Sequence, residues 1–85
     1  MNQSDASGNT LLHFAAKLNG TRELDFEIER GSSVNARNNE GQTPLHIAYK
    51  YGKYENATHL ILKGADQSIK CNLGKTPSDY DPNPV

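Results

Sequence analysis

Two threonine–histidine pairs are the side chains of this 85-residue chain best placed to do chemistry. His13 follows Thr10 by three residues, and His46 follows Thr43 at the same spacing. At that spacing on a helix, the hydroxyl and the imidazole lie on one face. A histidine that takes the proton of a hydroxyl is the arrangement used in nucleophilic catalysis. The competing interpretation is structural, because each imidazole can equally bond the hydroxyl and a neighbouring backbone carbonyl.

Carboxylates crowd a short stretch between the two pairs, and two of them could act as a general acid and a general base. They are Glu23, Asp25, Glu27 and Glu29. Basic residues lie near them, and no nucleophile or glycine-rich phosphate loop accompanies them. We therefore interpret these carboxylates as a solvated helix face.

Cys71 and His59 are the remaining reactive side chains. Cys71 falls in a turn, where we expect it to be exposed, and Lys70 could lower the pKa of its thiol only weakly. We expect His59 to be exposed on a helix and too far from His13 and His46 to share a metal ion. The sequence thus predicts no catalytic site, no metal site and no cofactor.

The composition excludes several broad classes of protein. Nine basic and ten acidic residues nearly balance, which argues against a nucleic-acid binder or an anionic-membrane binder. One cysteine allows no internal disulfide and no thiolate zinc cluster, so we expect a reducing compartment. No apolar run approaches the roughly 20 residues of a membrane span, and the first residues lack the pattern of a signal peptide. We expect a cytoplasmic, single-domain protein, with secretion by a route that needs no signal peptide as the open alternative.

The residues around each pair recur at a fixed distance. Thr10-Leu11-Leu12-His13-Phe14-Ala15 returns 33 residues later as Thr43-Pro44-Leu45-His46-Ile47-Ala48, and Gly74-Lys75-Thr76-Pro77 begins a third copy after another 33. Residues 5–37 laid on 38–70 give eight identities without a gap, where about two are expected from average composition. A constant period of this size indicates a stacked-repeat protein.

Turn and capping residues divide each copy into two helices. Threonine precedes the first helix as an N-cap, and glycine follows the second. Leu24–Ile28 alternates like a strand, but its copy in the next repeat has a helical pattern, so we predict a helix there as well. The expected helices run from Thr10 to the stop at Asn19-Gly20, over Arg22–Arg30, from Pro44 to about Tyr51, over Lys53–Lys63, and briefly over Thr76–Tyr80, where Asp81-Pro82-Asn83-Pro84 halts the chain.

The unit resembles an ankyrin repeat in its period, in Thr43-Pro44-Leu45-His46-Ile47-Ala48 and in Lys63-Gly64-Ala65-Asp66. The resemblance implies an all-α, helix-turn-helix solenoid with β-hairpin-like loops, in which the threonine–histidine pairs are structural locks. Leu11, Glu27, Tyr49, Ser78 and Asp79 depart from the usual residues. Glu27 stands where a buried leucine is usual, which suits an outermost repeat. We expect an N-terminal extension at 1–4, repeats at 5–37 and 38–70, a truncated third repeat at 71–80 and a disordered tail at 81–85.

The resemblance also implies where a partner docks, because ankyrin proteins bind through their hairpin tips and the exposed side of their first helices. Tyr51 and Leu73 are the expected anchors, and Lys50, Lys70 and Lys75 make one end of the surface positive, which suits an acidic protein partner. Ala6, Ser7 and Asn9 map to the same surface. The predicted partner-binding residues are Lys17, Leu18, Arg37, Asn39, Glu40, Gln42, Lys50, Tyr51, Lys70, Asn72, Leu73 and Lys75.

Two complete repeats are fewer than the three that a stable array usually needs. We therefore expect an uncovered apolar face formed by Tyr49, Tyr54, Ala57 and Ile61. A second copy of the chain, a partner, or the C-terminal segment with Tyr80 could cover it, or the chain could be part of a longer array. The predicted function is a non-catalytic protein–protein interaction module, such as an inhibitor or adaptor. The alternative is a structural protein that self-associates as a homodimer through this face.

Overall fold

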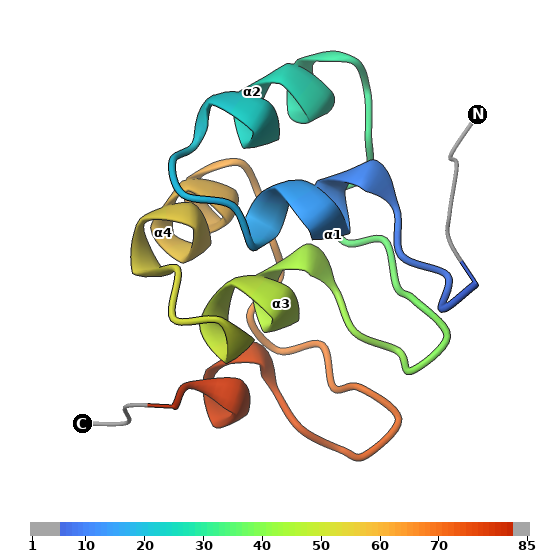
Figure 1. Cartoon of the computed structure of the whole chain (residues 1–85). Helices are drawn as coiled ribbons and strands as arrows, with labels where there is room; N and C mark the ends of the chain where they lie inside the picture. The colour runs from blue at the N-terminus through green and yellow to red at the C-terminus, as the bar shows by residue number, and fades with distance from the viewer. Residues whose placement is uncertain (1–5, 83–85) are drawn as a thin grey trace.

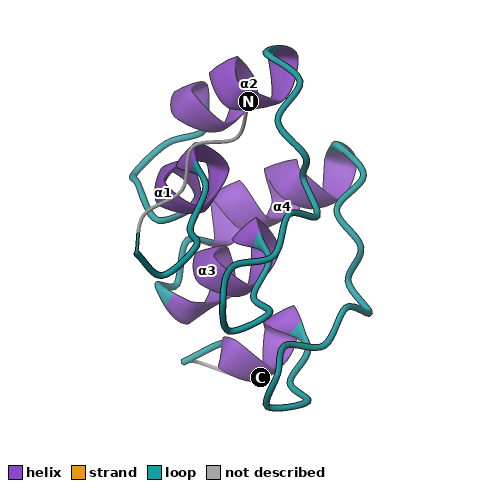
Figure 2. Ribbon diagram, turned by 90° about the vertical axis from the view of Figure 1, so that its right-hand side faces the viewer, coloured by secondary structure: helices purple, strands orange, loops and turns teal. Residues whose placement is uncertain are grey.

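The computed structural model describes residues 6–82, and within that range it is all-α, as predicted. The helices are α1 (Leu11–Ala16), α2 (Arg22–Glu29), α3 (Pro44–Lys50), α4 (Tyr54–Leu62) and the 3-10 helix η1 (Pro77–Tyr80). Figure 1 shows α1, α3 and η1 stacked in one layer, with α2 and α4 beside them. The long loops, residues 30–43 and 63–76, project together on one side (Figure 1), and the described range contains no strand (Figure 2). The predicted extension at 1–4 and the end of the predicted tail lie outside the described residues.

Each first helix begins at a threonine, as the sequence predicts. Thr10 and Thr43 have extended backbones, and the residue three positions later reaches back to the threonine backbone N–H. Thr76 begins η1 in the same way, although the reaching side chain is now the Asp79 carboxylate. The cap therefore recurs at the predicted period and satisfies a backbone donor that a helix start otherwise leaves unpaired.

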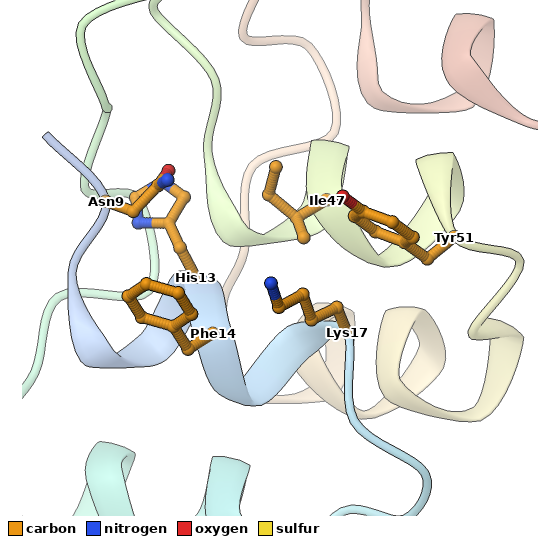
Figure 3. A pocket seen from close by; sticks show the side chains of 6 residues that line it. All are labelled: Asn9, His13, Phe14, Lys17, Ile47 and Tyr51. Atoms are coloured by element: carbon orange, nitrogen blue, oxygen red, sulfur yellow. The ribbon is translucent and has the colours of Figure 1, made fainter. Parts of the chain in front are cut away.

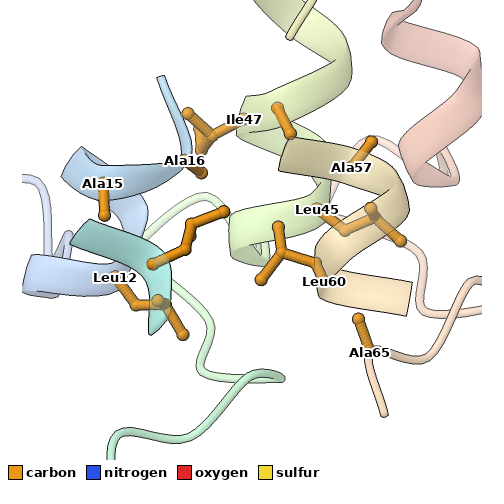
Figure 4. Close-up of a cluster of buried hydrophobic side chains, with 10 residues drawn as sticks. Leu12, Ala15, Ala16, Leu45, Ile47, Ala57, Leu60 and Ala65 are labelled. Atoms are coloured by element: carbon orange, nitrogen blue, oxygen red, sulfur yellow. The ribbon is translucent and has the colours of Figure 1, made fainter. Parts of the chain in front are cut away.

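The core lies between the two layers and is built from leucines and alanines (Figure 4). Its largest members, Leu12, Leu24, Leu45 and Leu60, are fully buried. Ala15, Ala16, Ala48 and Ala57 are small enough to let the helices approach closely, and they too are buried. This explains why the first helices can be only six and seven residues long: packing, and not intrinsic helix propensity, stabilises them.

The C-terminal segment covers α3, which is one of the three coverings predicted for the exposed end. Helix η1 packs on α3, and the Tyr80 ring meets the His46 ring edge-on with the centroids 5.5 Å apart. The Asp81 carboxylate accepts a hydrogen bond from the Tyr54 hydroxyl, so the predicted tail is held at its first residue. Ala57 was wrongly assigned to the uncovered face, because it is buried against the preceding repeat.

His46 joins neighbouring repeats through a fully buried imidazole. Its Nδ1 accepts a hydrogen bond from the Thr43 backbone N–H at 3.0 Å, so Nε2 carries the proton and donates to the Lys75 carbonyl at 2.9 Å. His13 repeats this pattern with the Thr10 N–H at 3.0 Å and the Gln42 carbonyl at 2.8 Å. Burial lowers the pKa of His46 below its ordinary value of 6.5. Both histidines therefore have the geometry of the predicted structural lock.

Replacing His46 by leucine should lower the free energy of unfolding by about 2 kcal/mol at pH 7, because the buried Thr43 N–H loses its acceptor. The pH dependence supplies a second readout. Because the folded pKa is depressed, the unfolded chain binds the extra proton first, so the stabilisation is complete above pH 6.5 and is lost as the pH falls below it. Urea titrations at pH 7 and pH 5 should show that lowering the pH costs His46→Leu less unfolding free energy than it costs the wild type. Equal losses in the two proteins would contradict the assignment.

Candidate functional site

Three loop tips, residues 6–9, 38–42 and 71–75, stack against one another and form the rigid edge of the candidate surface. The Asn39 backbone N–H donates to the Ser7 carbonyl at 2.9 Å, and its side-chain amide donates to the Ala6 carbonyl at 3.1 Å. Asn72 repeats both bonds one tip later, to Glu40 at 2.9 Å and to Asn39 at 3.0 Å. Two predicted contact residues, Asn39 and Asn72, thus also hold the tips together.

Arg37 is exposed on this edge, but its guanidinium is already engaged. Its Nε donates to the Gly41 carbonyl at 3.1 Å, and its Nη2 donates to the Lys70 carbonyl at 2.9 Å. The side chain therefore ties the second tip to the segment that leads into the third. A partner can contact Arg37, but only as part of this bonded frame.

Gln42 does not lie on the surface, contrary to its predicted position. The residue is only 4% exposed. Its amide nitrogen donates to the Tyr80 hydroxyl at 3.2 Å, and its amide oxygen accepts a bond from Asn38 at 2.9 Å. Its backbone carbonyl accepts a hydrogen bond from the His13 imidazole, so this glutamine takes part in the contacts between repeats.

A cluster of rings and ammonium groups lies on the open side of α1 and α3, and we call it the lysine–aromatic patch: Phe14, Lys17, Ile47, Lys50 and Tyr51. The Lys17 Nζ lies 5.0 Å from the centre of the Phe14 ring and 5.9 Å from that of Tyr51. The Nζ of Lys50, the residue that precedes Tyr51, also lies 5.9 Å from the centre of the Tyr51 ring. Within the patch, a pocket of about 40 Å³ opens between the two helices (Figure 3).

The structure divides the remaining predicted residues among separate places. Asn39, Glu40, Asn72 and Leu73 line a second hollow of about 330 Å³ together with Tyr80. Leu18 lines a different hollow, near Lys53 and Tyr54, and so lies apart from the patch. Lys70 is exposed, and Lys75 lies with its Nζ 5.6 Å from the Tyr80 ring.

Sequence reasoning missed two members of the patch, Phe14 and Ile47. Both occupy the same repeat position, which the motif Thr-x-x-His-x-Ala presents as a core position. Ile47 is mostly buried, but Phe14 is 38% exposed because no repeat precedes it within the described residues. The spacing of Phe14 and Lys17, three residues apart on one helix, was the signal that could have revealed the pair.

Two expectations about reactive side chains were wrong. Cys71 is buried, not exposed, and its Sγ lies 3.1 Å from the Tyr80 hydroxyl. His59 is not free in solvent, because it pairs with the Asp25 carboxylate of the preceding repeat. Both residues were judged from their own segment, whereas their surroundings come from another part of the chain.

One carboxylate of α2, that of Glu27, is less solvated than predicted, whereas Glu23 and Glu29 are exposed. The Glu27 side chain is only 13% exposed. It accepts a hydrogen bond from the Ser32 hydroxyl at 3.3 Å and lies 3.7 Å from the Arg30 guanidinium. Glu27 therefore caps the outer end of its own repeat and does not form an acid–base pair with a second carboxylate.

The described residues also bear on metals and membranes. No cluster of histidine, cysteine and carboxylate side chains among residues 6–82 has the geometry to hold a metal ion. Within the same range, no helix combines the length and apolar character needed to cross a bilayer.

The comparisons with known proteins agree with the repeated lock and the stacked tips. A family model described as ankyrin repeats in three copies matches residues 1–76. The chain belongs to the ankyrin repeat family. The resemblance identified from the 33-residue period is thereby confirmed.

Relatives of this ankyrin repeat chain are much longer proteins. It is 38% identical over 82 residues to the poly [ADP-ribose] polymerase tankyrase of Caenorhabditis elegans, which covers 94% of this chain and 4% of that protein. It is 37% identical over 73 residues to protein phosphatase 1 regulatory subunit 12A of Mus musculus, with 86% and 7% covered. It is 34% identical over 80 residues to NF-kappa-B inhibitor alpha of Gallus gallus, with 88% and 25% covered. The chain therefore spans a quarter or less of these relatives.

The stacked tips of the ankyrin repeats yield a matched pair of substitutions. Gly41 has a φ of 76°, and a Cβ added there would lie 2.6 Å from the Asn72 Oδ1, whereas Gly52 has a φ of 69° and faces open space. Gly52→Ala should cost about 1 kcal/mol of unfolding free energy through its backbone alone. Gly41→Ala should cost at least twice as much and should speed amide exchange at Asn72. Urea titration and hydrogen exchange measure both effects, and equal costs for the two variants would show that the tips are not tightly stacked.

Proposed function

We propose that this chain is a non-catalytic protein-interaction module whose partner lies across the loop tips and the open side of α1 and α3. The observation that carries the proposal is the pair of exposed apolar groups on this side, Tyr51 at 51% and Leu73 at 75% exposed. Aromatic and aliphatic groups that are accessible within a patch commonly supply most of the binding energy of an interface.

The frame beneath these anchors favours binding as well. The tips are joined by backbone and side-chain hydrogen bonds through Asn39 and Asn72, so their conformation is set before a partner arrives. Binding to a pre-organised surface costs less conformational entropy than ordering a flexible loop. Ankyrin repeats generally serve as protein-binding modules, and two of the relatives are named as a phosphatase regulatory subunit and an inhibitor. We propose a corresponding adaptor or inhibitor role for this chain.

The charges favour an acidic partner. The tips and first helices, residues 6–18, 37–51 and 70–80, carry five basic and two acidic residues. The second helices and the segments around them, residues 19–36 and 52–69, carry four basic and six acidic residues. A nearly neutral chain thus presents a basic binding side, and a partner of opposite charge would associate faster and in a preferred orientation.

A double variant tests the proposed surface. Tyr51→Ala with Leu73→Ala should weaken partner binding by about thirty-fold for each anchor that contributes about 2 kcal/mol. Leu62 is 76% exposed on α4, away from the surface, so Leu62→Ala is the matched control. Quantitative mass spectrometry should detect proteins that the wild type and the control retain from a lysate and that the double variant does not retain. The proposal fails if both variants retain the same proteins as the wild type.

A second candidate function is self-association, which one observation favours. On helix α4, Leu62 is 76% exposed and Tyr54 is 44% exposed. In the described range η1 is not followed by a second helix that could pack beside α4 and cover them. In the first repeat, the matching face of α2 lies against α4 and pairs Asp25 with His59. A second chain packed on α4 would cover these apolar groups.

Sedimentation across a dilution series separates this candidate from the first. If α4 mediates a homodimer, Leu62→Glu should shift the monomer–dimer midpoint to at least ten-fold higher concentration, because it buries a charge in an apolar contact. Tyr51→Ala should leave the midpoint unchanged. A chain that is monomeric at every concentration rules self-association out and leaves the partner-binding proposal intact.

A further inference from the structure

We infer that the lysine–aromatic patch is a recognition site for an acidic segment of a partner protein. A carboxylate side chain of that segment lies at the rim of the Tyr51 ring between Lys17 and Lys50. A small aliphatic side chain next to that carboxylate enters the pocket between α1 and α3. This inference rests on the proposed function and specifies which partner chemistry the surface takes.

The two ammonium groups converge from different repeats on a single ring. Lys17 comes from α1 and Lys50 from α3, and each Nζ lies 5.9 Å from the centre of the Tyr51 ring. Contact with the ring does not neutralise either lysine, since an aromatic ring has no net charge. An anion beside Tyr51 would therefore experience the attraction of two ammonium groups.

Within residues 6–82, no ion pair involves Lys17 or Lys50. Among the described residues, no carboxylate lies within 4 Å of either ammonium group, whereas His59 and Arg30 each have one. The acidic residues cluster on α2, which lies in the other layer of helices from α1 and α3 (Figure 1). The patch is thus a local excess of positive charge in a chain whose net charge is −1.

The pocket defines the second half of the recognised segment. Phe14 and Ile47 form apolar walls, and the Lys17 stem and the Tyr51 ring lie beside them (Figure 3). Its volume is about 40 Å³, well below the roughly 150 Å³ of an engineered cavity that holds benzene. Such a pocket admits the end of a small aliphatic side chain but not a nucleobase or another aromatic ring. The combination fits a protein segment with an Asp or Glu next to a residue such as Ala or Val.

Selection from a random twelve-residue peptide display library tests the inference directly. The wild type should enrich peptides in which an Asp or Glu lies next to a small aliphatic residue. The variant Lys17→Gln with Lys50→Gln should lose that enrichment, whereas Lys63→Gln, which removes an exposed charge at the end of α4, should keep it. Circular dichroism melting of all three proteins shows that the variants remain folded.

A charge exchange with one selected peptide gives the decisive measurement. By fluorescence anisotropy, changing the acidic residue of the peptide to its amide should weaken binding about ten-fold, in line with two partly exposed ion pairs. Lys50→Glu should likewise weaken binding to the acidic peptide and should bind the version with lysine at that position more tightly than the wild type does.

Other outcomes overturn the inference. They include selected peptides without acidic enrichment, enrichment that survives in the double glutamine variant, and tighter binding of an oligothymidine than of the selected peptide. If these results appear while Tyr51→Ala with Leu73→Ala still loses a captured protein, the proposed function stands and the assignment of partner chemistry falls.

Discussion

The neutral imidazole of His46 is the interaction on which the rest of this structure depends. One ring nitrogen accepts from the backbone at the start of its own helix, and the other donates to a carbonyl of the following repeat. A single side chain thereby fixes where a helix begins and how two repeats stack. A charged imidazole could not do both, since it has no acceptor to offer the Thr43 N–H. Burial supports the neutral form, because it lowers the pKa of this residue.

The surface proposed to bind a partner follows from this lock. The imidazoles of His13 and His46 donate hydrogen bonds to the backbone carbonyls of Gln42 and Lys75, the last residues of the second and third tips. The same tips are joined at their outer ends by Asn39 and Asn72. With both ends held, the tips and the short first helices keep a fixed spacing, and side chains from neighbouring repeats, such as Lys17 and Tyr51, come close together. The proposed binding surface therefore combines side chains from neighbouring repeats.

Much of the fold could be predicted from the sequence because it depends on local capping and turn residues that recur in each repeat. Threonine caps, Pro44 at the first helical position and glycines after the second helices each act within a few residues, and the 33-residue period places them in register. The positions of Gln42, Cys71 and His59 could not be predicted in this way. Gln42 bonds to Tyr80, 38 residues later, and His59 pairs with Asp25, 34 residues earlier. Tyr80 also covers Cys71 from nine residues away, beyond the turn from which the exposure of Cys71 was predicted.

The exposure of Tyr51 and Leu73 agreed with the expectation, since both positions point away from the repeat core. The role of the patch as a binding site stays a prediction. Phe14 was missed for a related reason: its repeat position is a core position wherever a neighbouring repeat covers it. A motif describes the interior of an array, so residues at the ends of the array depart from it in exposure even when they match it in type.

The carboxylate of Asp79 changes what the third helix start can bond to. Asp79 receives the Thr76 N–H just as the histidines receive theirs, so the third helix start is complete. An ionised carboxylate, however, only accepts hydrogen bonds and has no proton to pass to the next carbonyl. Within residues 6–82, the contact that runs from His13 to Gln42 and from His46 to Lys75 therefore has no counterpart at Asp79. A unit stacked beyond Tyr80 would have to be held by contacts of another kind.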